Sequence, residues 1–175
     1  NKQHSPLLRL PAELRNKIYK HVLGGHEIYA RVENAPFTSR KIWREQHGLC
    51  KAIRALPRTS AQLRHETALL VYKYNTFRVR SYDLDFFFDV VGESAARALR
   101  HLVIEHCSVL LNTSYRRLYD VYRHGSLAHI EVLIRTGRDG GYLAEVQKRL
   151  EQGFGGTGCA RDIEVVVGEG EMVIC

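Results

Sequence analysis

The chain has 175 residues, of which 45% are hydrophobic and 26% are charged, and these proportions are ordinary for a globular protein. A domain of this length buries about two-thirds of the surface that its unfolded chain exposes, so it needs neither a metal nor disulfides to fold. No apolar run approaches the ~20 residues of a membrane-spanning helix, and we expect one compact domain over residues 1–175.

The net charge of +7 is unevenly distributed along the chain. Residues 1–64 hold 13 Lys and Arg against four Asp and Glu, a net of +9, whereas residues 65–175 hold 13 against 15, a net of −2. A basic half of this kind is typical of proteins that bind nucleic acids or acidic proteins, although an ordinary solvated surface can have the same composition. The candidate basic surface consists of Arg40, Lys41, Arg44, Lys51, Arg54 and Arg58.

The four cysteines are Cys50, Cys107, Cys159 and Cys175, and no two of them have the C-x-x-C spacing of a zinc site or a redox pair. The sequence also shows no apolar stretch of the kind found in a secretory signal. We therefore expect reduced thiols and a location in the cytoplasm or the nucleus.

The first predicted helix begins at Pro11, which suits a first helical turn because its missing N–H would have no partner there. Apolar residues then recur every four positions and form one stripe along the helix. The pair Gly24-Gly25 ends the helix. The stripe consists of Leu14, Ile18 and Val22, with Leu10 one turn earlier.

A strand is expected after this helix, because Ile28, Ala30 and Val32 alternate with longer or polar neighbours. Residues 33–50 have few apolar positions and several loop-forming residues. We therefore expect an exposed loop there, with a helical turn around Trp43.

The second strong helix is expected from Ser60 to Tyr74, because apolar residues recur at helical spacing over this stretch. Thr59 and Gln62 have the spacing of a capping box, which favours a helix start at this point. Residues 75–80 then alternate as a strand.

The second half of the chain repeats a rhythm of helix followed by strand. Asp83 is the expected cap of its first helix, and Gly92 separates the first helix from the second. The expected elements are helices over 84–91, 95–99, 111–122 and 143–150, and strands over 101–105, 130–134, 162–167 and 172–174.

Helices that alternate with apolar strands indicate an α/β fold, with α+β as the alternative. Connections of this length favour parallel pairing between the strands at 102–105 and 130–135. A turn at residues 168–170 would make the last two strands antiparallel. The sequence thus predicts N-terminal helices packed on a mixed, partly parallel sheet. Residues 7–80 hold these helices with an inserted loop and strands, and residues 81–175 form the α/β half of the chain.

Two stretches of the sequence resemble a known family. Residues 10–19 read Leu-Pro-Ala-Glu-Leu-Arg-Asn-Lys-Ile-Tyr, and residues 58–67 read Arg-Thr-Ser-Ala-Gln-Leu-Arg-His-Glu-Thr, with Asn-Thr-Phe at 75–77. In order and content these motifs resemble the F-box-like domains of filamentous fungi, in which an Arg usually stands where this chain has Ala61. The resemblance covers about residues 7–105.

The resemblance implies a docking role for the first helix. A true F-box is a three-helix unit that docks on the Skp adaptor of a cullin-type ubiquitin ligase, largely through its Leu-Pro pair and the apolar residues after it. In this chain, however, about 35 residues separate the first helix from the second. The stripe is also what any core helix would show, so adaptor docking and core packing both stay open. By resemblance, the docking residues are Leu10, Pro11, Leu14 and Ile18.

No set of residues forms a coherent catalytic, cofactor or metal site in the sequence. Residues 153–158 satisfy G-x-G-x-x-G, but they follow an expected helix and precede a strand, which is the reverse of a dinucleotide site. His106 and Cys107 are neighbours on a strand and therefore point to opposite faces. Arg116 and Arg117 lie beside tyrosines that we expect to face the core, which disfavours stacking with nucleic-acid bases.

We therefore expect a non-enzymatic protein-interaction module without cofactors or metals. By resemblance it would be an F-box-like substrate-recognition subunit of a cullin-type ubiquitin ligase, with a Skp-type adaptor as its partner. The alternative is a nucleic-acid-associated protein that uses the basic N-terminal region.

Overall fold

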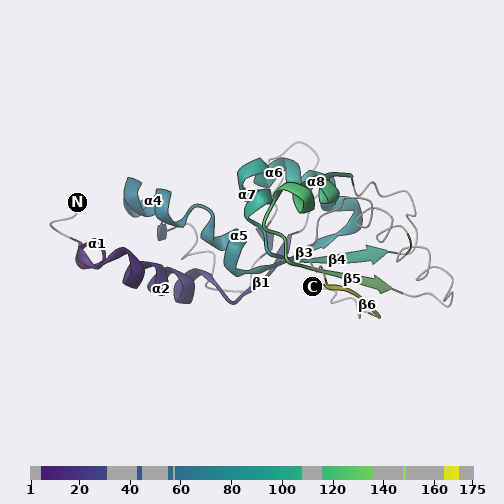
Figure 1. Cartoon of the computed structure of the whole chain (residues 1–175), viewed down its shortest axis with the longest axis horizontal. Helices are drawn as coiled ribbons and strands as arrows, with labels where there is room; N and C mark the ends of the chain where they lie inside the picture. The colour runs from purple at the N-terminus through teal and green to yellow at the C-terminus, as the bar shows by residue number, and fades with distance from the viewer. Residues whose placement is uncertain are drawn as a thin grey trace.

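The computed structural model describes residues 5–30, 43–44, 55–56, 58–107, 116–135, 148 and 164–169. Within these ranges, six strands form one sheet, and the helices form an N-terminal arm and a layer over the sheet (Figure 1). The strands are β1 (Glu27–Ala30), β2 (Trp43–Arg44), β3 (Thr76–Arg80), β4 (His101–Cys107), β5 (His129–Arg135) and β6 (Glu164–Glu169). The helices are α1 (Pro6–Arg9), α2 (Ala12–Leu23), α4 (Ala61–Thr67), α5 (Leu70–Tyr74), α6 (Leu84–Val91), α7 (Glu93–Ala98) and α8 (Arg116–His124), with a 3-10 turn η1 (Ser81–Asp83).

The sheet has the strand order β2-β1-β3-β4-β5-β6. Its five strands from β1 to β6 pair in parallel, whereas β2 pairs antiparallel to β1. This confirms the predicted α/β fold with a mixed sheet, and the parallel pairing of 102–105 with 130–135 is also confirmed, since Leu102 lies opposite Ile130. Parallel neighbours need crossover connections, and helices lie between β1 and β3, between β3 and β4 and between β4 and β5.

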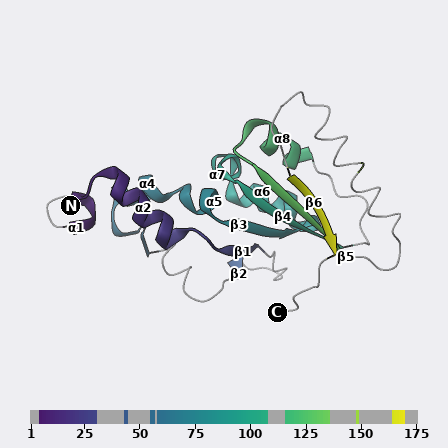
Figure 2. The same ribbon diagram turned by 60° about the horizontal axis from the view of Figure 1, so that its bottom comes forward.

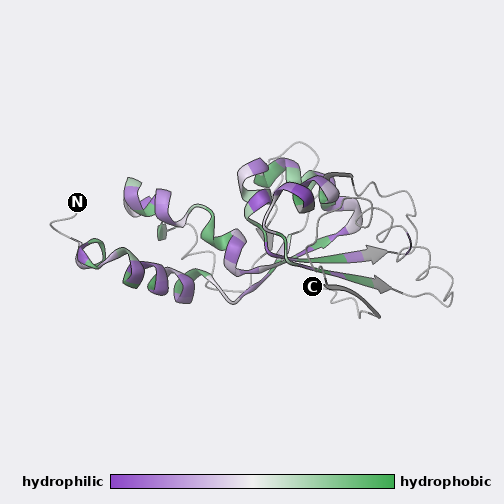
Figure 3. Cartoon of the chain, in the orientation of Figure 1, coloured by the Kyte–Doolittle hydropathy of each residue, from purple (hydrophilic) through white to green (hydrophobic). Residues whose placement is uncertain are grey.

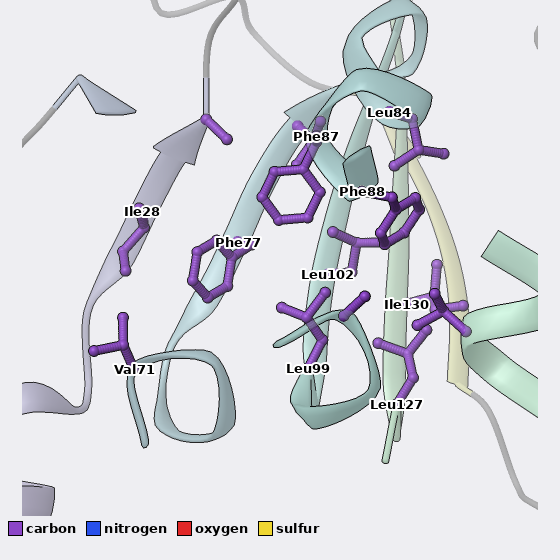
Figure 4. Close-up of a cluster of buried hydrophobic side chains, with 14 of the residues drawn as sticks. Ile28, Val71, Phe77, Leu84, Phe87, Phe88, Leu99, Leu102, Leu127 and Ile130 are labelled. Carbon is purple, nitrogen blue, oxygen red and sulfur yellow. The ribbon is translucent and has the colours of Figure 1, made fainter. Parts of the chain in front are cut away.

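One face of the sheet carries the core. Because the strands are in register, Phe77, Leu102 and Ile130 lie side by side and are each fully buried. Helices α6, α7 and α8 lie over this face, and Phe87 and Phe88 of α6 point down toward it (Figure 4). Among the described residues, no helix lies on the opposite face of the sheet.

The arm consists of α1, α2, α4 and α5, and it extends beyond the end of the sheet (Figures 1 and 2). Its inner residues continue the core of the sheet: Tyr19 and Leu23 of α2 and Val71 of α5 belong to the same cluster of buried side chains as Phe77. The N-terminal helices therefore adjoin the end of the sheet through shared apolar contacts and do not cover one of its faces, as the predicted packing on the sheet would require.

The structure corrects three local predictions in the first part of the chain. The helix expected from Ser60 to Tyr74 is two helices, because a turn at residues 68–69 separates α4 from α5. The expected helical turn at Trp43 is instead strand β2, whose backbone pairs with β1. Leu10 ends α1 and does not extend the stripe of α2, because the extended residues at positions 10 and 11 separate the two helices.

The second half follows the predicted rhythm, with two differences. Asp83 precedes α6 but makes no capping hydrogen bond, because its carboxylate accepts from Arg80. The expected turn at 168–170 is wrong in its first two residues, since Gly168 and Glu169 continue β6 beside β5. The expected strand at 172–174 and most of the expected helix at 143–150 lie outside the described residues.

Candidate functional site

A cluster of polar side chains joins α2 to α4 in the arm. The carboxylate of Glu66 accepts from Arg15 at two points, with Nε to Oε2 at 3.0 Å and Nη2 to Oε1 at 2.6 Å. The hydroxyl of Tyr19 donates to Oε2 at 2.8 Å, and the amide of Gln62 donates to Oε1 at 2.8 Å. Four hydrogen bonds therefore converge on one carboxylate, and the three from Arg15 and Tyr19 hold α2 and α4 in one orientation.

The environment of this cluster shifts the ionisation of its members. The hydrogen bond from Arg15 is the largest cause that lowers the pKa of Glu66 to about 2, while burial acts in the opposite direction. Burial, followed by the hydrogen bond to Glu66, raises the pKa of the fully buried Tyr19 to about 12. At neutral pH the cluster thus holds a carboxylate, a guanidinium and a neutral phenol. Because neither the Glu66 nor the Tyr19 pKa lies near neutral pH, the cluster suits a structural role better than proton transfer.

Asn75 ties the base of the arm to the sheet. Its buried side-chain amide donates to the backbone carbonyls of Leu23, the last residue of α2, at 2.6 Å and of Val71 in α5 at 2.8 Å. Its Oδ1 accepts from the backbone N–H of His26 at 2.9 Å, just before β1. One side chain therefore joins α2 and α5 to the start of a strand.

These braces decide which face of α2 turns outward. Arg15, Tyr19 and Leu23 recur every four residues and face α4 and α5. The stripe one residue earlier then faces solvent, and its members are Leu14, Ile18 and Val22, with 45%, 37% and 40% of their surface exposed. The interpretation of this stripe as part of the core is therefore wrong, because the polar Arg15 finds its partner inside the arm.

The four predicted docking residues are not equivalent in the structure. Leu14 and Ile18 lie together on the exposed face of α2, and Pro11 is exposed at its start. Leu10 is half-buried at the end of α1, where its carbonyl accepts from Arg15 at 2.7 Å. The structure thus brings two of the four, Leu14 and Ile18, onto one surface and adds Val22 to it.

Basic side chains flank the exposed stripe. Lys17 and His21 lie next to it on the helix, and Lys20 is exposed one step further round, where its ammonium lies 5.8 Å from the Tyr74 ring centroid. Glu13 is the one acidic residue within α2. Figure 3 shows these hydrophilic and hydrophobic residues interleaved along the helix. An apolar stripe with a basic border fits a partner surface that is apolar and acidic.

Most of the predicted basic surface lies outside the described residues. Of its six members, the structure describes Arg58 and the backbone of Arg44. Arg58 is exposed, two residues before the cap of α4. The other four members, Arg40, Lys41, Lys51 and Arg54, fall in the ranges that the structure does not describe, as does the glycine-rich segment 153–158.

Two histidines face each other on neighbouring strands of the sheet. His101 and His129 lie opposite each other at the starts of β4 and β5, with ring centroids 5.9 Å apart. Burial, and then the nearby His129 and Arg100, lower the pKa of His101. The described part of the chain contains no group of three metal-ligating residues, and none of its helices is long and apolar enough to cross a membrane. His106 and Cys107 belong to β4, but their side chains lie outside the described set.

Reasoning from the sequence missed the roles of Arg15, Glu66 and Asn75, although all three lie in the motifs quoted above. A second four-residue repeat in the first helix, at positions 15, 19 and 23, could have indicated these roles. Because this repeat begins with a charged Arg, it resembles a helix face that is exposed to solvent. Comparison with family models, curated proteins and solved structures finds no match to this chain.

Proposed function

We propose that this chain is a non-enzymatic protein-interaction module that docks a partner protein through the outer face of α2. The observation that carries this proposal is the exposure of Leu14, Ile18 and Val22 on a helix whose other side is braced by buried contacts. Large apolar side chains aligned on one face of a helix are typical of helix-in-groove recognition, in which side chains about one turn apart anchor in an apolar groove.

The identity proposed for the partner follows from the resemblance to F-box-like domains. The stripe contains two of the positions that the resemblance assigns to adaptor contact, Leu14 and Ile18, and the basic Lys17 beside them favours an acidic groove. We therefore propose a Skp-type adaptor of a cullin ubiquitin ligase as the partner, with this chain as the substrate-recognition subunit.

Binding of purified adaptor to the full chain tests this proposal. Leu14→Glu and Ile18→Ser each place a polar group in the apolar contact, and we expect either to weaken binding about tenfold or more. Leu69→Ser is the matched control, because Leu69 is equally exposed on the arm but lies outside the stripe of α2. Circular dichroism establishes that each variant is folded. Adaptor binding that is equal in all three folded variants and the parent would remove the ubiquitin-ligase proposal.

The alternative proposal is nucleic-acid binding by the basic first 64 residues, whose net charge is +9. Such binding weakens steeply with salt, because released counterions lose their entropic advantage. A labelled RNA or DNA duplex titrated with the full chain at low and moderate salt tests it. Absence of binding at ~50 mM salt, where electrostatic attraction is strongest, would eliminate this alternative.

A further inference from the structure

Two lysines from different helices meet at one aromatic ring where the arm joins the sheet (Figure 1). Lys20 lies in the last turn of α2 and is exposed, and Lys73 lies in the last turn of α5 and is half-buried. Their Nζ atoms lie 5.8 Å and 5.5 Å from the centroid of the Tyr74 ring. The fold therefore brings two positive charges that are far apart in the sequence to one place.

The position of this ring is fixed by the backbone around it. The Tyr74 carbonyl accepts from the backbone N–H of Gly25 at 3.0 Å, and Gly24 is so close that a Cβ on it would lie 2.8 Å from the Tyr74 Cβ. The Asn75 amide joins α2 and α5 at the same level. A Cβ on Gly25 would meet nothing within 4 Å, so the space beside this junction is open. The two lysines therefore extend from a braced and accessible part of the molecule.

The two lysines have no anionic partner in the part of the chain that the structure describes. Neither Lys20 nor Lys73 forms an ion pair there. The segments that build the junction, residues 14–26 and 67–82, contain no Asp or Glu. Glu13, the one acidic residue of α2, lies about two helical turns before Lys20. The other acidic residues that border these segments each pair with an arginine; they are Glu27, Glu66 and Asp83.

The C-terminal ends of α2 and α5 offset only part of these two charges. A helix end carries at most about half an elementary negative charge, which explains why a lysine is favourable in each last turn. The face of Tyr74 also attracts an ammonium group, but an aromatic ring has no net charge to neutralise it. About one unit of positive charge therefore stays at the junction, and a bound anion can neutralise it.

We propose that the junction of α2 and α5 binds a phosphomonoester dianion between the ammonium groups of Lys20 and Lys73. Phosphoryl oxygens accept charge-assisted hydrogen bonds, and the flexible lysine stems allow both ammonium groups to reach one phosphoryl group. A phosphomonoester carries about 1.5 to 2 negative charges at neutral pH, which matches two lysines at one point. A nucleic-acid backbone instead spreads single charges along a strand and is bound by several cations in a row.

This inference goes beyond the adaptor proposal and does not depend on it, because Lys20 and Lys73 lie outside the apolar stripe of α2. It also differs from the nucleic-acid alternative, since it assigns one compact site to a single phosphoryl group. The site is open to a phosphorylated side chain of another protein and to a small phosphorylated molecule, which share this chemistry.

An NMR titration of the isotope-labelled full chain with inorganic phosphate, at constant ionic strength, tests the site. We expect saturable shifts at the amides of Gly25 and Tyr74. Lys20→Met and Lys73→Met keep an apolar stem but remove the charge, and each should weaken phosphate binding at least about fivefold. Lys17→Met is the matched control, because Lys17 is also exposed on α2 but is not one of the two lysines at the ring. Circular dichroism establishes that each variant is folded.

Two further ligands identify the charge and the source of the phosphoryl group. Dimethyl phosphate carries a single charge and should bind more weakly than inorganic phosphate. An amidated Gly–Ala peptide with one phosphoserine is compared with the same peptide without the phosphate. Tighter binding of the phosphopeptide than of free phosphate would support a phosphorylated protein as the source, and equal affinity would support a small phosphorylated molecule.

Three outcomes would overturn the proposal. The first is the absence of saturable shifts with both phosphate and the phosphopeptide. The second is a loss of affinity in Lys17→Met as large as that in Lys20→Met, which would indicate a diffuse basic surface. The third is tighter binding of a uridine oligonucleotide than of the phosphopeptide, lost in the Lys20 and Lys73 variants, which would assign the junction to nucleic acid. None of these measurements includes the adaptor, so failure of the adaptor proposal leaves them unaffected.

Discussion

Arg15 and Glu66 form a two-point ion pair between helices that are 51 residues apart in the sequence. The side chain of Arg15 retains 11% of its exposure and that of Glu66 retains 21%, so the pair is largely shielded from water. Because Tyr19 lies one turn after Arg15 and donates to the same carboxylate, two consecutive turns of α2 are held against α4. This pair therefore sets the rotation of α2 that exposes Leu14 and Ile18.

The stability of the arm is expected to depend on pH through Glu66. Its pKa is about 2 in the folded chain against an ordinary value of 4.5. Between pH 4.5 and pH 2, Glu66 is therefore mostly protonated in the unfolded chain and mostly ionised in the folded chain. The stabilisation from this group is complete above pH 4.5 and is lost as the pH falls toward 2. Urea unfolding across this range should show that the parent loses more unfolding free energy than Glu66→Gln, so the two converge at low pH.

The matched control for this experiment is Glu13→Gln, because Glu13 is an exposed carboxylate of the same α2 helix. Its substitution should change the unfolding free energy by no more than about 0.5 kcal/mol at neutral pH. A constant difference between the parent and Glu66→Gln from neutral pH to pH 2 would contradict the role assigned to the ionised carboxylate.

Replacing Asn75 by Ala should destabilise the fold by about 2–4 kcal/mol, because the carbonyls of Leu23 and Val71 lose a buried hydrogen bond and the N–H of His26 loses a partly buried one. Chemical unfolding monitored by circular dichroism measures the loss. Asn16→Ala provides the comparison, since Asn16 is exposed on α2 and its substitution should cost less than about 0.5 kcal/mol. Similar costs at both positions would show that Asn75 does not join the arm to the sheet.

The start of α4 provides a third prediction, which distinguishes two adjacent hydroxyls. The capping box predicted at Thr59 is not formed; instead, Ser60 is the cap, and its Oγ accepts from the Leu63 N–H at 3.1 Å. Ser60→Ala should cost about 1 kcal/mol. Thr59→Ala should cost less, because the exposed Thr59 hydroxyl donates to the Leu56 carbonyl rather than to an unpaired N–H of the helix. A larger loss of unfolding free energy at Thr59 would reverse the assignment.

Gly24 and Gly25 should resist substitution for different reasons. A Cβ at Gly24 would lie 2.7 Å from the Lys20 carbonyl oxygen and 2.8 Å from the Tyr74 Cβ, whereas one at Gly25 meets nothing within 4 Å. Gly25 instead has a φ of +80°, which costs most L-residues about 1–2 kcal/mol.

Unfolding measurements on Ala and Asn variants separate these two causes. At Gly25, Asn should be less destabilising than Ala, because Asn tolerates the left-handed conformation better. At Gly24 the larger Asn side chain should offer no relief over Ala, because the obstacle there is space. If Asn improved on Ala equally at both positions, the steric explanation for Gly24 would be wrong.

The sequence by itself determined strands β1, β3, β4 and β5 and the parallel pairing of β4 with β5. Apolar residues alternate in β3 and run together in β4 and β5, and connections long enough for a helix leave parallel pairing as the usual outcome. The sequence also predicted the end of α2 at Gly24, because glycine ends a helix through its local backbone conformation. Each of these features depends on residues close together in the chain.

Tertiary structure alone decided which side of α2 is buried and therefore where the candidate docking surface lies. Two four-residue repeats compete in that helix, and hydropathy favours burial of the one that contains Leu14 over the one that contains Arg15. The outcome is the reverse, because Glu66 supplies Arg15 and Tyr19 with a partner from a helix far along the chain. A local pattern records which residues are apolar, but a buried polar group is stabilised by its partner, and that partner becomes a neighbour only when the chain folds.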